Sequence, residues 1–319
     1  MSENILPVPT GPKLWLMAAR AYSFPASIIP VLLGSVLAVL LNPGLKFNFL
    51  NFFLCLIGCL LVQVGTNLIN DIFDYDTGID KEDKALGIPH GGSMVISMGL
   101  VSMKQMKAAA VITLMIAFFI GVYLYTQAGA WIIYLTLFGL LSAVFYTAKP
   151  LALKYKALGD LQVIFSFGLG MTLGAYIVQT KQFSYLPLLF SIPIGMLIDA
   201  ILHSNNIRDI NFDGKFGVKT LPILIGEKLS VKVYYALILG AYLCLIIFVV
   251  LNLLPWFALL SLITLPLALK AVKMSEGFPS DGIARFDYGT QHIMMTAQLN
   301  MMFGLTLVLG LLLSYLFFS

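Results

Sequence analysis

Two clusters of acidic and amide side chains interrupt a chain that is otherwise strongly apolar. The first cluster runs from Asn67 to Asp80, and the second runs from Asn205 to Asp213. Each stands at the end of a hydrophobic stretch long enough to cross a bilayer, where carboxylates are costly and usually functional. Oxygen ligands without converging His or Cys side chains favour a hard cation, so the clusters predict a Mg²⁺ site.

Helical spacing places the members of each cluster on one face. In the first cluster they follow i, i+3, i+4 and i+7: Asn67, Asn70, Asp71 and Asp74. In the second they follow i, i+4 and i+8: Asn205, Asp209 and Asp213. If the two faces meet, each pair of carboxylates at ~4 Å repels by about 4 kcal/mol, which only cations or protonation can offset. Because Mg²⁺ commonly shares its shell with substrate phosphate, we also expect a phosphate-bearing substrate.

Basic side chains on the same predicted face of the membrane are available to bind phosphate oxygens. They are Arg20, Lys149, Lys154, Lys156, Arg208 and Lys219. The three lysines between 149 and 156 can be explained nearly as well without phosphate binding, as interfacial residues whose side chains extend toward the lipid headgroups. We expect at least one of these three lysines to bind phosphate.

Three further polar residues each allow two interpretations. Asp160 is either the N-cap of the following helix or a contact to the acceptor or metal. Asp199 and His203 are spaced i, i+4 and form either an internal hydrogen-bonded pair or an acid/base pair acting on an acceptor hydroxyl. For this pair we favour the structural interpretation.

The composition excludes an ordinary soluble protein. Of 319 residues, 60% are hydrophobic and 11% are charged, whereas soluble domains carry about 25% charged residues. We predict a polytopic all-α membrane protein with a single domain, 1–319, and nine transmembrane helices. The apolar stretches fall at 21–41, 50–71, 105–127, 130–147, 159–179, 184–203, 232–252, 255–273 and 293–318. Kinks are expected inside the first helix at Pro25 and Pro30 and inside the eighth at Pro266. The three cysteines lie in apolar stretches, so no disulfide is expected.

The basic residues orient these helices. On this map all Lys and Arg side chains except Lys46 and Lys181 lie on one side, and basic residues concentrate on the cytoplasmic face. The N-terminus is therefore predicted inside and the C-terminus outside. The first ten residues lack the features of a cleaved secretory signal. Both acidic clusters open onto the inner face at the start of long connections, and long loops in compact proteins are usually functional.

Four motifs together resemble the UbiA superfamily of intramembrane prenyltransferases, and the resemblance covers nearly the whole chain. They are Asn67-x-x-Asn-Asp-x-x-Asp-x-x-x-Gly-x-Asp80, Asn205-Asn-x-Arg-Asp-x-x-x-Asp213, Gly217-Val-Lys-Thr-Leu221 and Arg20-Ala-Tyr-Ser-Phe-Pro-Ala-Ser27. Within the superfamily, three segments are most similar to the MenA-type 1,4-dihydroxy-2-naphthoate prenyltransferases and their animal vitamin K counterpart. These are Tyr146-Thr147, Ala157-Leu-Gly-Asp160 and Asp199-Ala-Ile-Leu-His-Ser-Asn-Asn206.

The resemblance implies nine helices around a central cavity that the two long loops cap. It implies Mg²⁺ between the clusters, a polyprenyl diphosphate donor and an aromatic quinone precursor as acceptor. The metal ligands implied are Asn67, Asp71, Asp74, Asp209 and Asp213, of which the four carboxylates are catalytic. The substrate-binding residues implied are Arg20, Asn67, Asn70, Lys149 or Lys154, Asp160, Asn205, Asn206 and Arg208. His90 in the first loop could contact the acceptor.

Two alternatives keep the same acidic clusters. An enzyme of another branch would use 4-hydroxybenzoate, homogentisate or a porphyrin as acceptor. A transporter would use the acids to bind its cargo, but it needs access from both faces, and here the charges gather on one. No feature points to nucleic-acid binding. We therefore expect a prenyltransferase of the bacterial inner membrane.

Overall fold

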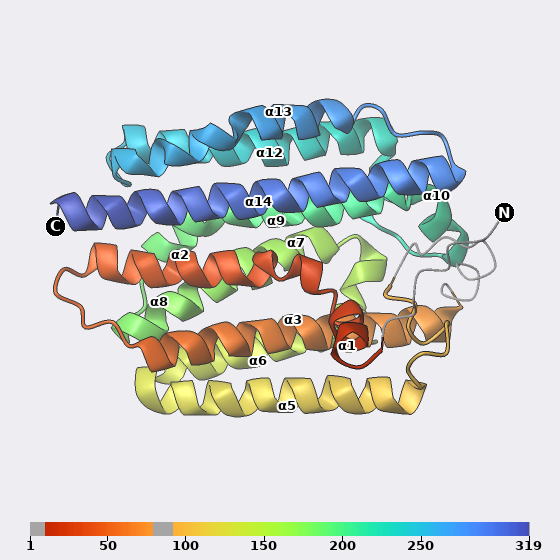
Figure 1. Cartoon of the computed structure of the whole chain (residues 1–319), viewed down its shortest axis with the longest axis horizontal. Helices are drawn as coiled ribbons and strands as arrows, with labels where there is room; N and C mark the ends of the chain where they lie inside the picture. Colours follow the sequence, from red (N-terminus) through yellow and green to blue (C-terminus); the bar gives the residue numbers. More distant parts are fainter. Residues whose placement is uncertain (1–9, 79–91, 319) are drawn as a thin grey trace.

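The computed structural model describes residues 10–78 and 92–318, which form helices and no strand. The long helices run along one common axis (Figure 1). The α-helices are α1 (Pro12–Ala18), α2 (Pro25–Leu41), α3 (Phe49–Thr77), α5 (Met103–Ala128), α6 (Ala130–Phe145), α7 (Gly159–Val163), α8 (Thr172–Thr180), α9 (Leu186–Arg208), α10 (Ile210–Asp213), α11 (Leu221–Ile225), α12 (Glu227–Val250), α13 (Leu265–Met274) and α14 (Gly282–Phe318). The 3₁₀ segments are Ala21–Ser23, Leu153–Lys156, Gly214–Phe216 and Trp256–Thr264, and the segment η3 (Ile164–Met171) is a π-helix.

Eight helical segments of the described chain are long and apolar enough to cross a membrane, and α6 is a shorter apolar helix beside them. These nine segments correspond one by one to the nine predicted stretches. The protein is therefore a multi-pass membrane protein built from helices alone, as the sequence predicted.

Four predicted ends were placed wrongly, and one of them is the start of the seventh helix, which lies at Glu227 rather than 232. The second helix continues past 71 to Thr77 and stops at Gly78, whose φ of 88° favours glycine. The sixth runs on past 203 to Arg208, and the last helix begins at Gly282 rather than 293. In all four cases charged or amide residues lowered the local hydropathy without ending the helix. The long connection after α9 also contains two short helices, α10 and α11.

The prolines act at segment boundaries more than inside helices. Pro25 occupies the first turn of α2, after a 3₁₀ turn, and Pro266 occupies the first turn of α13, where a 3₁₀ segment changes to α-helix. Both residues lie within the predicted spans 21–41 and 255–273, at the point where each span changes from 3₁₀ to α-helix. A missing N–H costs nothing in a first turn, because that group has no helical partner there. Pro30 lies inside α2, as predicted.

Close helix packing surrounds the centre of the bundle. A Cβ atom at Gly34 of α2 would lie 2.1 Å from the Thr172 carbonyl oxygen of α8. A Cβ atom at Gly168 of η3 would lie 2.6 Å from Gly195 Cα of α9. Small residues let membrane helices approach closely, so these contacts hold α8, η3 and α9 against their neighbours.

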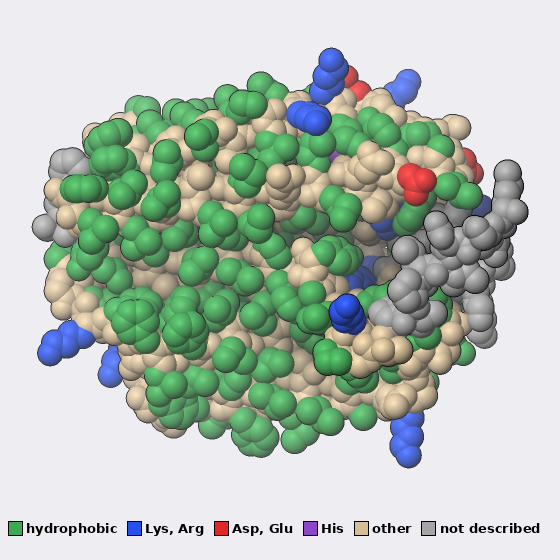
Figure 2. Space-filling view, in the orientation of Figure 1, with side chains coloured by type: hydrophobic (Ala, Val, Ile, Leu, Met, Phe, Trp, Pro, Cys, Tyr) green, Lys and Arg blue, Asp and Glu red, His purple; other side chains and the backbone are tan. Residues whose placement is uncertain are grey.

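The surface divides into an apolar belt and a charged end. Large apolar side chains such as Phe119, Trp131 and Leu243 are exposed along the bundle, and Figure 2 shows hydrophobic side chains covering most of one face. The C-terminal ends of α3 and α9, together with α10, lie at the end of the bundle opposite the C-terminus (Figure 1). The two acidic clusters therefore lie at the same end of the molecule.

Candidate active site

The first acidic helix end is buried and paired with a base from another segment. Asp71 of α3 is 1% exposed and forms an ion pair with the Arg20 guanidinium. The Ser93 hydroxyl and backbone N–H also donate to this carboxylate. Ser93 lies beside Val95 and Ile96, which pack on Leu68 and thereby fix this contact. Arg20 has backbone angles of φ 53° and ψ 53°, an unusual conformation that often accompanies function.

Asp74, one turn further along α3, is paired with Lys154. The ammonium lies 2.9 Å from Asp74 Oδ1 and 2.9 Å from Asn70 Oδ1, and Asn70 Nδ2 donates to Asp74 Oδ2 at 2.7 Å. Burial, the largest single influence, lowers the pKa of Lys154, but the Asp74 carboxylate together with Tyr155, Tyr146 and Asp213 raises that pKa above its usual value. Lys149 is exposed and does not line the cavity described below. Of the two predicted lysines, Lys154 is therefore the one that reaches the acidic residues.

The second acidic helix end carries its own base. Arg208, the last residue of α9, donates to both carboxylate oxygens of Asp209 at 2.7 Å and to Asn205 Oδ1 at 2.9 Å. The helix breaks at Asp209 and resumes in α10, which ends at Asp213. The Asp213 carboxylate makes no hydrogen bond or ion pair with the described residues. Burial and then the nearby Asp209 carboxylate raise the pKa of Asp213 to about 7.

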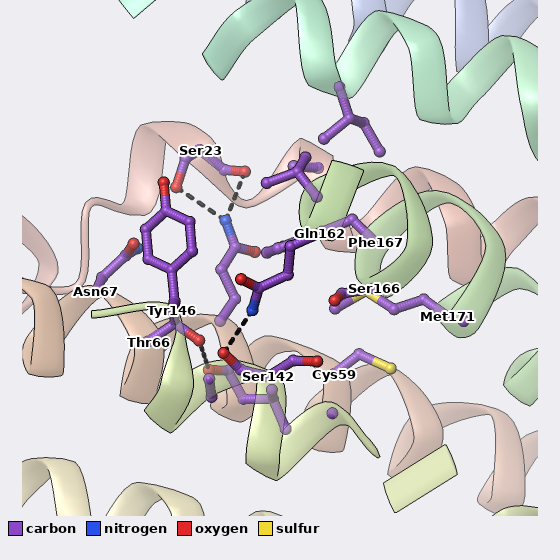
Figure 3. A pocket seen from close by; sticks show the side chains of 18 of the residues that line it. Ser23, Cys59, Thr66, Asn67, Ser142, Tyr146, Gln162, Ser166, Phe167 and Met171 are labelled. Carbon is purple, nitrogen blue, oxygen red and sulfur yellow. Dashed lines mark hydrogen bonds between the residues drawn. The ribbon is translucent and has the colours of Figure 1, made fainter. Parts of the chain in front are cut away.

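One cavity of about 490 Å³ joins the two helix ends. The predicted site residues that line it are Arg20, Asn67, Asn70, Lys154, Asn205, Asn206, Asp209 and Asp213. The other five predicted site residues, Asp71, Asp74, Lys149, Asp160 and Arg208, are not among its lining residues. Away from these polar residues the wall is mainly apolar, with contributions from Phe167, Met171 and Leu124. Figure 3 shows part of this wall.

The acids are interleaved with bases instead of crowded together. Within residues 10–78 and 92–318, no group of three or more His, Cys, Asp and Glu side chains is arranged to hold a metal ion. This differs from the predicted cluster of carboxylates because Arg20, Lys154 and Arg208 each neutralise one of them. The donor set still fits Mg²⁺. Among the described residues Asp213 has no partner, and Asn67 uses only its amide nitrogen, which donates to the Ala19 carbonyl at 2.9 Å.

Known proteins match this fold and these motifs. Residues 27–277 match the model of the UbiA prenyltransferase family. The chain belongs to the UbiA prenyltransferase family. It is 34% identical to a 1,4-dihydroxy-2-naphthoate octaprenyltransferase of Bacillus subtilis, over 96% of this chain and 94% of that protein. It is 31% identical to UbiA prenyltransferase domain-containing protein 1 of Danio rerio, over 94% of this chain and 84% of that protein.

Solved structures share the architecture. A UbiA homologue from Aeropyrum pernix K1 has a TM-score of 0.67 and 18% identity, covering 92% of this chain and 96% of the homologue. A UbiA homologue from Archaeoglobus fulgidus, bound to GPP and Mg²⁺, has a TM-score of 0.62 and 13% identity, covering 92% of this chain and 99% of the homologue. At these identities the likeness establishes the UbiA fold.

Asp160 and His203 form a pair outside the cavity of this UbiA family member. His203 Nδ1 lies 2.9 Å from Asp160 Oδ1, and His203 Nε2 lies 3.0 Å from the Ser230 carbonyl oxygen. The N-cap interpretation of Asp160 is wrong, because Leu158 is the N-cap of α7. The contact of Asp160 to the acceptor or metal stays a prediction. The predicted bond between Asp199 and His203 is absent from the described contacts. His90 lies outside the described residues.

Sequence reasoning missed Arg285, which secures the second helix end. Arg285 is only 3% exposed. Its guanidinium donates to the Ile207 carbonyl at 2.6 Å and to the Arg208 carbonyl at 3.0 Å. It also binds Glu227 at 2.9 Å. These carbonyls at the end of α9 have no intrahelical partner, so Arg285 acts as a cap from α14. A basic residue between 273 and 293 was the available signal, but that region was assigned to a loop.

Proposed function

We propose that this protein transfers a polyprenyl group from its diphosphate to 1,4-dihydroxy-2-naphthoate in a Mg²⁺-dependent reaction. One observation carries the proposal: a single cavity has acids and bases from two distant helix ends at its mouth and an apolar wall beyond. A prenyl diphosphate has the same division between a charged head and an apolar tail. The named activities of the Bacillus subtilis relative and of a Haemophilus influenzae relative, 32% identical, support naphthoate as the acceptor.

The bases at the cavity mouth suit a diphosphate. Arg20 Nε is buried and makes no hydrogen bond among the described residues, so this side chain retains a donor after binding Asp71. Lys154 lines the cavity together with Asp213. We assign these two bases to the phosphate oxygens of the donor. Arg208 is instead assigned a positioning role, since its guanidinium is bound to Asp209 and Asn205.

We assign Asn67, Asp71, Asp74, Asp209 and Asp213 to holding Mg²⁺ and, through it, the diphosphate. When bound, the metal supplies positive charge that stabilises the departing diphosphate. Arg20 and Lys154 exchange their carboxylate partners for phosphate oxygens. Residues 92–102, where Ser93 contacts Asp71, keep this helix end in place. The rest of the first long loop, residues 79–91, for which a capping role was predicted, lies outside the described residues.

The donor and the acceptor together supply every electron pair that the reaction needs. The allylic C–O bond breaks, and its electron pair leaves with the diphosphate. The electron-rich ring then attacks the allylic carbon at the position that bears the carboxylate. Loss of CO₂ returns the electron pair to the ring, so the transfer step releases diphosphate and CO₂ and needs no oxidant. The apolar wall of the cavity excludes water, which would otherwise convert the allylic cation to an alcohol.

The proposal includes one catalytic domain over 1–319 and an orientation in the membrane. The charged end of the bundle is assigned to the cytoplasm because most basic residues lie in its connections. The bacterial inner membrane is the proposed location, and the donor, the acceptor and the lipid bilayer are the proposed partners. Exposure of an added C-terminal tag on the outer face of intact cells would test this orientation. A tag accessible only after lysis would contradict it.

The deciding experiment gives purified protein a labelled polyprenyl diphosphate with a panel of aromatic acceptors. We expect prenylated product and CO₂ with 1,4-dihydroxy-2-naphthoate, and no product when Mg²⁺ is chelated. Prenylation of 4-hydroxybenzoate or homogentisate in its place would assign the protein to another branch of the family. Flux of a solute across proteoliposomes without any prenyl transfer would favour a transporter.

A further inference from the structure

A second set of polar side chains lines the cavity away from the acidic helix ends. Its members are Ser23, Gln63, Thr66, Ser142, Tyr146, Gln162 and Ser166. Figure 3 shows Gln162 between Tyr146 on one side and Ser166 on the other. These groups are neutral, so they suit hydroxyl or carbonyl groups of a ligand better than a diphosphate.

Some members of this set already form hydrogen bonds within the protein. Gln63 Nε2 donates to the Ser23 carbonyl and hydroxyl, both at 2.9 Å, and the Ser27 hydroxyl donates to Gln63 Oε1 at 2.5 Å. The Thr66 hydroxyl donates to the Val62 carbonyl of its own helix. These side chains join α2 to α3 and have satisfied hydrogen bonds without a ligand.

Gln162 Oε1 and Ser166 Oγ are different, because both atoms are buried and neither has a hydrogen-bond partner in the described chain. Gln162 Nε2 donates to the Ser142 carbonyl at 2.6 Å. A carbonyl oxygen can only accept, so the amide nitrogen must face Ser142 and Oε1 is left as an acceptor. Ser166 can donate or accept. An orphaned acceptor and an orphaned hydroxyl on one cavity wall indicate that a ligand completes them.

The wall that carries these atoms leads directly to the proposed diphosphate site. Lys154, which binds Asp74, donates its backbone N–H to the Tyr146 carbonyl at 2.8 Å. Tyr146 in turn contacts the start of α7, because a Cβ atom at Gly159 would lie 3.4 Å from its ring. Gln162 follows on α7, and Ser166 lies in the π-helical segment η3, a rare conformation frequent at functional sites. Lys154, Gln162 and Ser166 therefore line the same cavity, so a ring bound at Gln162 shares that cavity with a donor bound at Lys154.

We infer that Gln162 and Ser166 recognise the hydroxyl groups of the aromatic acceptor, an assignment that rests on the proposed function. Gln162 Oε1 accepts a hydrogen bond from one ring hydroxyl, and Ser166 Oγ binds the second polar substituent. A neutral amide holds a phenolic proton without removing it, so its contribution is to binding and orientation. A site that leaves a buried acceptor unpaired discriminates against rings lacking the matching hydroxyl.

The test compares the KM values of both substrates in wild type and in Gln162→Met. We expect the KM for 1,4-dihydroxy-2-naphthoate to rise about tenfold, as for the loss of one buried hydrogen bond, and the KM for the prenyl diphosphate to stay unchanged. The preference of the wild type for the dihydroxy acceptor over a monohydroxy naphthoate is expected to shrink as well. Gln127→Met, at the exposed end of α5, makes the same chemical change away from the cavity and serves as the matched control.

If Gln162→Met fails to fold, Ser166→Ala is the second test. Ser166 Oγ makes no hydrogen bond to any described residue, so its removal should not disturb folding. We expect a smaller rise in acceptor KM with normal thermal unfolding. Unchanged acceptor KM values in the folded variants would overturn the inference. A fall in kcat without a change in acceptor KM would also overturn it, since the groups would then act on the allylic cation.

Failure of the proposed function gives a different result. In that case the wild type does not prenylate 1,4-dihydroxy-2-naphthoate at all. If it prenylates another hydroxylated ring, the same KM comparison with that acceptor decides the role of Gln162. Acceptor binding measured by fluorescence quenching in detergent micelles, without donor or metal, gives an independent readout. We expect weaker binding to both variants, and equal binding to variants and wild type would contradict the assignment.

Discussion

The two acidic helix ends are built differently. At the end of α3, Asp71 and Asp74 are at most 1% exposed, and their partners Arg20 and Lys154 come from distant segments. At the end of α9, Asp209 is paired with the adjacent Arg208, and the half-buried Asp213 has no partner in the part of the chain that the structure describes. Both carboxylates of the first end are therefore bound by distant segments, whereas at the second end the Asp213 carboxylate has no partner among the described residues and lines the cavity.

This difference separates two tasks. Ion pairs that connect distant segments hold α3 in register with the α6–α7 connection and the start of α2. A free carboxylate is available to a cation without breaking an existing contact. We therefore expect substitutions at the first end to reduce both stability and activity, and substitutions at Asp213 to reduce activity alone.

The largest expected effect is on turnover, and it does not distinguish the two ends. Asp71→Ala and Asp209→Ala should each reduce prenyl transfer by at least about 10³-fold, because each removes charge that organises the metal and the diphosphate. Product formation with labelled donor measures this in protein shown to be monodisperse. Asp281→Ala, at an exposed position before α14, is the control. Near-normal turnover in either variant would refute the assigned roles.

The second prediction concerns stability and separates the ends directly. Asp74→Ala leaves the Lys154 ammonium without its ion-pair partner, and breaking such a buried pair costs about 3 kcal/mol. Asp213→Ala removes no described side-chain contact and should leave the thermal midpoint near that of the wild type. Thermal unfolding in detergent, without metal or substrate, measures both. Equal loss of stability in the two variants would remove the distinction.

A third measurement distinguishes the two lysines after α6. Lys154→Gln should raise the KM for the prenyl diphosphate about tenfold, because it removes a charge-assisted bond to phosphate. The same change at the exposed Lys149 should leave this KM unchanged. Steady-state kinetics at saturating acceptor measure both values. The reverse order would show that the ammonium seen on Asp74 is structural only.

The smallest expected effect is at Ser93. Ser93→Ala removes one hydroxyl bond to Asp71 but keeps the backbone N–H contacts, so a loss of about 1 kcal/mol, or roughly fivefold in kcat/KM, is expected. Initial rates with both substrates measure it. A loss as large as that of Asp71→Ala would mean that the first end depends on the loop more than on Arg20.

Most of the fold could be predicted because transmembrane helices can be recognised from the local hydropathy of the sequence. The errors have the same origin. Helix α3 continues through its acidic residues to Thr77, and α14 begins before Arg285, since charge lowers hydropathy without ending a helix. The aromatic and aliphatic residues between 293 and 318 were recognised, whereas the charged turns before them were not.

The acidic part of the site was predictable because its spacing follows the helical period. The partners of those acids were not, since they depend on tertiary contacts between distant segments. Nothing local distinguishes Lys154 from Lys149, or marks His203 as the partner of Asp160 rather than Asp199. In the sequence Gln162 is likewise only a polar residue in an apolar stretch, and its hydrogen bond to Ser142 is known only from the structure.

Arg285 has a consequence for biosynthesis. Its guanidinium joins the last two carbonyls of α9 to Glu227, at the start of α12. It belongs to α14, which follows both helices along the chain and therefore leaves the ribosome after them. A nascent chain that has inserted every earlier crossing still lacks this clamp on its second acidic helix end. Catalytic competence should therefore arrive only after α14 has inserted, so that a chain translated only as far as α12 does not ionise prenyl donors in an open, wet cavity.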